Sequence, residues 1–157
     1  MRRLVAGLLI LLLALSLGAC GEKTFSGPLR LAVELSLDAE ERAFVVGGDT
    51  NVPEGAKLMV IVQRVQAPFL VVGMADAVVA KGRYETRLPY AEDALVPGLY
   101  QALVSLTPLE QNEDVLAVIG AEGEHIPELG VEDGEIVEQD QPVKLVYLHG
   151  WAMIEVE

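Results

Sequence analysis

The sequence has 157 residues, 24 of them acidic and 11 basic, and its net charge is −13. Binding to nucleic acid or to an anionic lipid surface requires basic patches, and beyond Arg2-Arg3 the basic residues form no run. We therefore expect no nucleic-acid partner. The only cysteine, Cys20, excludes an intramolecular disulfide and a zinc site built from cysteines.

The first nineteen residues have the layout of a secretory signal. Two arginines give a positive start, the run Leu4–Leu17 is almost uniformly apolar, and the small residues Gly18 and Ala19 follow it. A membrane-spanning helix needs about 20 apolar residues, so this run is too short to span comfortably. Residues 1–19 are therefore predicted to be a signal peptide that is cleaved.

The end of this segment, Leu17-Gly18-Ala19-Cys20, resembles the lipobox of bacterial lipoproteins. In that family a lipid is attached to the cysteine thiol and the chain is cut just before it. The resemblance implies cleavage between Ala19 and Cys20 and acylation of Cys20, whose acyl chains would hold the protein in a membrane. We expect an extracytoplasmic protein, anchored by lipid to the cell membrane or the outer membrane.

The rest of the chain is predicted to be a short tether and one domain. Residues 20–28 are polar and contain glycine, which is typical of a flexible linker. Fully extended, the eight residues after Cys20 reach about 26 Å, so the domain would lie close to the membrane. Residues 29–157 are enough for a single domain with its own core.

Period-two alternation of apolar and polar residues predicts strands along this domain. The pattern is clearest over residues 29–37, where alternate positions are leucine or valine. Residues 57–65 are apolar on both faces, which favours a central strand or one covered on both sides. Further strands are expected at 42–47, 69–72, 75–80, 83–88 and 97–106, with turns at 38–41 and 81–82. This spacing predicts an all-β sandwich of about seven to nine strands.

Pro97-Gly98-Leu99-Tyr100 resembles the entry to a late strand in immunoglobulin-like and fibronectin type III-like sandwiches. In those folds a tyrosine hydroxyl bonds to backbone a few residues upstream. The resemblance implies this role for Tyr100, with an ordinary half-buried tyrosine as the alternative. The Cys-Trp-Cys framework of antibody domains is absent.

One short helix is expected near residues 113–119. Asn112 is a suitable N-cap, acidic residues follow it in the first turn, and Gly120 is a suitable stop. Residues 143–156 are expected to form a C-terminal hairpin that turns at His149-Gly150, with Leu148 opposite Trp151. Both faces of this hairpin are apolar, so it needs cover on both sides. We expect the helix near Val115 to cover one of these sides, with a partner protein as the alternative.

No catalytic, metal or cofactor site is predicted. His125 and His149 are expected to be surface residues, because no nucleophile motif or third metal ligand accompanies them. The acidic clusters at 38–41 and 132–140 do not follow a calcium-loop pattern and are expected to be solvated. The predicted function is a non-catalytic binding or structural module of the bacterial cell envelope, with a protein or another envelope component as its partner. One alternative is a small envelope enzyme or calcium-binding domain that uses acidic residues of the 122–140 region. Another is an inhibitor or lipid carrier, which needs an apolar cavity or an exposed apolar patch.

Overall fold

The computed structural model of this protein describes residues 29–91, 95–126, 135–140 and 144–157. The predicted signal peptide (1–19), the tether (20–28) and the predicted acylation site at Cys20 lie outside these residues. The described domain starts at Leu29.

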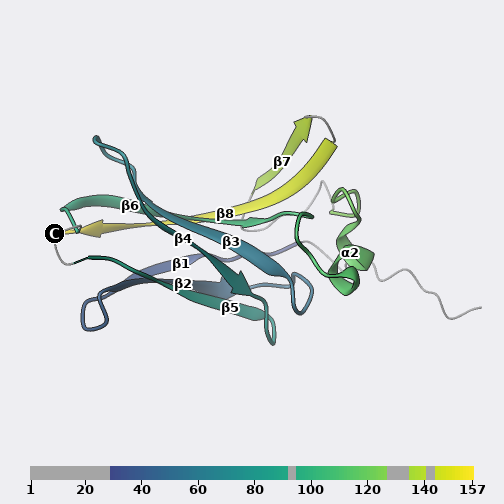
Figure 1. The fold of residues 1–157 in the computed structure, drawn as a ribbon, viewed down its shortest axis with the longest axis horizontal. Helices are drawn as coiled ribbons and strands as arrows, with labels where there is room; N and C mark the ends of the chain where they lie inside the picture. The colour runs from purple at the N-terminus through teal and green to yellow at the C-terminus, as the bar shows by residue number, and fades with distance from the viewer. Residues whose placement is uncertain (1–28, 92–94, 127–134, 141–143) are drawn as a thin grey trace, which may run out of the picture.

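The described residues form two antiparallel sheets that pack face to face, with one short helix at an end of the sandwich (Figure 1). One sheet has three strands in the order β1-β2-β5 and the other has five in the order β4-β3-β6-β8-β7. The strands are β1 (Glu34–Asp38), β2 (Ala43–Asp49), β3 (Lys57–Arg64), β4 (Leu70–Val78), β5 (Arg83–Pro89), β6 (Gly98–Leu106), β7 (Glu135–Asp140) and β8 (Lys144–Val156), and the helix is α2 (Glu113–Ile119).

The predicted all-β sandwich with one short helix is confirmed. The chain crosses between the sheets from β2 to β3, from β4 to β5 and from β5 to β6. Strands β1, β2 and β5 therefore share one layer and β3, β6 and β8 the other, which is the distribution of strands A, B, E and C, F, G in immunoglobulin-like sandwiches. Strand β4 pairs with β3, so the fourth strand lies in the five-stranded sheet.

The core lies between the two sheets and follows the period-two pattern. Alternate residues of β3 (Leu58, Val60 and Val62) are completely buried, and they face inward with alternate residues of β6. From the other sheet, Phe44 and Val46 of β2 complete the layer. Residues at alternate positions of a strand share a face, so the same alternation sends the residues between them outward.

Tyr100 has the role that its motif predicted. Its side chain is fully buried, and its hydroxyl donates a hydrogen bond to the Val96 carbonyl (2.7 Å) and accepts one from the Val96 N–H (3.2 Å). The ring packs against Phe44 with a centroid distance of 5.0 Å. The hydroxyl thus fixes the segment that leads into β6, as in a tyrosine corner.

The helix and the turn before β5 also form where they were predicted. The Asn112 side chain accepts a hydrogen bond from the Val115 N–H (2.9 Å), and the helix ends at Gly120. Lys81 and Gly82 both have positive φ, 56° and 73°, which is the backbone of a type I′ hairpin turn.

The two short runs expected around Gly73 form one strand, β4. Val62 pairs with Gly73 and Gln63 pairs with Val71, so Val72 is an extra residue without a partner on β3. This bulge bends the strand without ending it. The break in the sequence pattern therefore marks a shift of register between two halves of a single strand.

The predicted C-terminal hairpin at 143–156 is wrong. His149 and Gly150 lie inside β8, which continues from Lys144 to Val156. The first half of β8 pairs with β7, while the segment from Leu148 onward pairs with β6 in nine consecutive register positions. A turn at Gly150 would forfeit this long pairing with β6, so the chain stays extended there. The antiparallel partner of the first half of β8 is β7, which precedes it in the chain.

Candidate functional site

An apolar row crosses the outer face of the five-stranded sheet. In the register of the sheet, Ile61 of β3 lies between Met74 of β4 and Leu103 of β6, and Leu103 pairs with Trp151 of β8. Cross-strand partners share a face, so the four side chains form one line over four strands. Met59 and Met153 lie in the neighbouring rows on the same face. We call these six residues the apolar stripe: Met59, Ile61, Met74, Leu103, Trp151 and Met153.

The apolar stripe is open to solvent at both of its ends. Met74 is 64% exposed, Trp151 49% and Met153 54%, while Ile61 and Leu103 in the middle are half-buried. Single exposed apolar residues are ordinary on a protein surface, whereas contiguous apolar patches mark sites of interaction. Tryptophan and methionine are also enriched in protein–protein interfaces, and charged residues are depleted from their centres.

Helix α2 does not cover the outer face of β8 at Trp151 and Met153. Val115 and Ile119, on the apolar face of the helix, are fully buried in the core of the sandwich. The helix therefore closes one end of the space between the sheets (Figure 1), and Trp151 and Met153 remain exposed. A partner protein is the alternative cover that the sequence suggested.

Two pairs of polar side chains next to the apolar stripe contact each other across strands. Ser105 and His149 are cross-strand partners, with the serine hydroxyl 3.3 Å from the histidine Nδ1. Gln63 donates a hydrogen bond to the Gln101 side chain at 3.2 Å. Ser105 is only 1% exposed, so its hydroxyl is inaccessible to a substrate and its bond to His149 is structural. His149 thus lies in a strand, whereas a turn was expected there. The other histidine, His125, is exposed, and its backbone N–H donates a hydrogen bond to the Ile119 carbonyl (3.0 Å).

A pocket of about 280 Å³ adjoins the apolar stripe at Met59. It lies between the ends of β3 and β4 and the loop that follows β6. Two apolar side chains and several polar ones line it: Met59, Leu109, Lys57, Asp76, Thr107, Glu110 and Gln111. Nothing in the sequence pattern indicated this pocket, because the loop from 107 to 111 meets β4 only in three dimensions.

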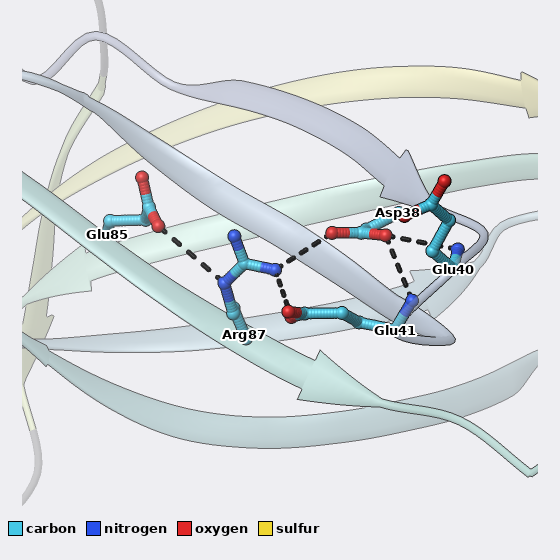
Figure 2. A network of polar contacts seen from close by, with 5 residues as sticks. All are labelled: Asp38, Glu40, Glu41, Glu85 and Arg87. Carbon is cyan, nitrogen blue, oxygen red and sulfur yellow. Dashed lines mark hydrogen bonds and ion pairs between the residues drawn. The ribbon is translucent and has the colours of Figure 1, made fainter.

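The outer face of the three-stranded sheet is charged instead. Arg87 of β5 forms ion pairs with Asp38 (2.9 Å) and Glu41, and its Nε lies 3.8 Å from Glu85 (Figure 2). The other Asp38 oxygen accepts hydrogen bonds from the backbone N–H groups of Glu40 and Glu41. These bonds and the Arg87 guanidinium hold the pKa of Asp38 below its ordinary value, and the same carboxylates raise the pKa of Arg87.

The acidic cluster at 38–41 is therefore part of a turn stabilised by Arg87. In the described ranges, no three histidine, cysteine, aspartate or glutamate side chains lie close enough together to hold a metal ion. The whole of the cluster at 132–140 falls outside the residues whose side chains are described. The alternative function in the 122–140 region accordingly stays a prediction.

No helix in the described part of the chain is both long and apolar enough to cross a membrane. The chain matches no protein-family model, no curated protein and no solved structure. The surface of the domain is consequently the main source of information on its function.

Proposed function

We propose that this protein is a non-catalytic lipoprotein of the bacterial cell envelope that binds another protein through its apolar stripe. The observation that carries the proposal is the contrast between the two outer faces of one sandwich. One face is charged around Arg87, and the other exposes Met74, Trp151 and Met153. Of these two outer faces, the apolar one belongs to the five-stranded sheet. Its exposed tryptophan and methionine residues are of the types enriched in protein interfaces.

A flat surface supports protein binding better than lipid transport. A lipid carrier needs an apolar cavity, and small-molecule sites usually enclose about 300–1,000 Å³. The apolar stripe lies on the face of a sheet, and the pocket beside it is smaller and has charged residues in its lining. A protein partner can cover the stripe from Met74 to Trp151 at once.

The proposed anchor rests on Leu17-Gly18-Ala19-Cys20 and is tested separately. Replacing Cys20 with serine removes the thiol that would carry the lipid, so the Cys20→Ser protein should take up no labelled fatty acid in growing cells. It should also keep its signal peptide, because lipobox cleavage follows lipid attachment in the resembling family. Recovery of the variant in membranes at mature size would refute the lipoprotein assignment.

The proposed interface is tested by chemical crosslinking in intact envelopes, followed by mass spectrometry. Changing Met74 and Met153 to glutamine makes the stripe polar at two positions that are more than half exposed, so folding should persist. We expect the crosslinked partner of the wild-type protein to be lost. A matched control, Val96→Gln, changes an exposed apolar residue outside the stripe and should retain the partner. Equal crosslinking of both variants would contradict the proposed interface.

A further inference from the structure

The apolar stripe and the pocket beside it form one continuous surface. Met59 belongs to both, and Asp76 lies beside it as its cross-strand partner on β4. A protein that covers the stripe therefore meets the pocket at the same time. The chemistry of the pocket then restricts what that protein presents there.

The pocket has a fixed wall. The Gln111 side chain accepts a hydrogen bond from the Lys57 N–H (2.9 Å) and donates to the carbonyls of Lys57 (2.8 Å) and Thr107 (2.9 Å). These bonds tie the loop after β6 to the start of β3. The loop thereby holds Leu109, which is 54% exposed, and Glu110 next to the end of the sheet.

The lining of the pocket carries more negative than positive charge. Asp76 and Glu110 are both exposed, and neither carboxylate has an ion pair or hydrogen bond within the part of the chain that the structure describes. Lys57 is the single cationic residue of the lining. Two carboxylates against one ammonium leave the pocket net negative, while Met59 and Leu109 supply apolar surface.

We propose that the partner inserts an arginine or lysine side chain into this pocket while neighbouring apolar residues cover the stripe. This inference rests on the proposed function and adds the chemistry of the partner. Long basic side chains have an apolar stem and a charged head, which match the Met59–Leu109 surface and the two carboxylates. The net charge of −13 repels a second copy of this chain and attracts a basic partner.

Selection from a displayed library of random twelve-residue peptides on the full chain, purified from membranes, tests this proposal. Trp151 is the only tryptophan of the chain and lies in the stripe, so its fluorescence reports binding of each selected peptide. We expect enrichment of peptides with arginine or lysine next to apolar residues. Reversing both charges, with Asp76→Lys and Glu110→Lys, should weaken these peptides about three- to tenfold, as expected for two exposed charges.

A control variant carries the same change of net charge on the other sheet. Glu34→Lys with Glu40→Lys should leave the affinity of the peptides unchanged within about twofold at physiological salt, because charges beyond about 8 Å are largely screened there. Peptides that alter Trp151 fluorescence without a preference for basic residues would overturn the cationic occupant and leave the protein interface intact. If Met74→Gln with Met153→Gln weakened none of the selected peptides, both the cationic occupant and the protein interface would be overturned.

Discussion

Tyr100 contributes to this fold both through its ring and through its hydroxyl. The ring is buried against Phe44, where the two sheets meet, and the hydroxyl bonds both backbone groups of Val96. Tyr90 also packs its ring on Phe44, at 5.6 Å, but its hydroxyl has no hydrogen bond within the described ranges. The two tyrosines thus separate the effect of the ring from that of the hydroxyl.

Replacing Tyr100 with phenylalanine should lower the free energy of unfolding by about 1–2 kcal/mol. The change keeps the buried ring and removes the bonds to Val96, each of which is worth about 0.5–1.5 kcal/mol. Urea unfolding followed by circular dichroism measures the difference. Tyr90→Phe is the matched control and should cost less than about 0.5 kcal/mol. Equal losses for the two variants would show that the Tyr100 hydroxyl has no special role.

Asp38 should make folding stability depend on pH. Its folded-state pKa lies below the ordinary 3.8, since the backbone N–H of Glu41 and the side chain of Arg87 favour the charged form. A lowered pKa stabilises the folded state above the ordinary value, and this stabilisation is lost as pH falls through the folded-state pKa. The melting temperature of the wild-type protein should therefore exceed that of Asp38→Asn at about pH 7, with the gap closing as the pH falls below 3.8 and through the lowered pKa.

Glu40→Gln is the control for this pH series. It removes a carboxylate from the same turn but keeps the Glu40 N–H that bonds Asp38. We expect no comparable gap that closes in acid. A gap between wild type and Asp38→Asn that stays constant down to about pH 2 would refute the role of the Asp38 charge.

At the scale of the elements, the turn before β5 shows how local backbone geometry defines a strand connection. Lys81 and Gly82 both adopt positive φ, a region that costs most residues about 1–2 kcal/mol but is open to glycine and asparagine. A Cβ on Gly82 would lie 3.5 Å from the Thr50 carbonyl, an ordinary contact. The positive φ of residue 82, and not a lack of room for a side chain, therefore favours glycine at this position.

Two substitutions in this turn should have opposite effects on stability. Gly82→Ala should destabilise the protein by about 1 kcal/mol through its positive φ. Lys81→Asn should stabilise it by about 0.5 kcal/mol, because Asn-Gly is a favoured type I′ pair, and the backbone bond from residue 81 to Glu54 (2.8 Å) is kept. Thermal unfolding measures both effects; a loss of stability in Lys81→Asn would contradict the assigned turn.

Elements defined by local rules could be predicted from the sequence, whereas those defined by their neighbours could not. The cap at Asn112, the turn at Lys81-Gly82 and the apolar run over residues 57–65 are local signals, and the structure has the cap, the turn and strand β3 at these places. The course of β8 through Gly150 depends on its pairing with β6, which is more than forty residues away along the chain. A local turn signal at His149-Gly150 could not reveal that competing partner.

At the scale of the whole molecule, the two sheets divide the surface into a charged face and an apolar face. The sequence showed that β3 is apolar on both sides and that the Trp151 segment needs cover, so the ingredients of the candidate site could be predicted. Their assembly into one stripe required the register that places Met74, Ile61, Leu103 and Trp151 in a line. The pocket could not be predicted, because it depends on the position of the loop after β6.

Position-specific photocrosslinking in living cells tests the central claim most directly. A photoreactive amino acid replaces Met74, in the apolar stripe, or Glu85, on the charged face of the other sheet. We predict that light links the protein to a second envelope protein from position 74 and not from position 85. Adducts of equal yield from both positions, or none from position 74, would contradict the claim that the apolar stripe is a protein interface.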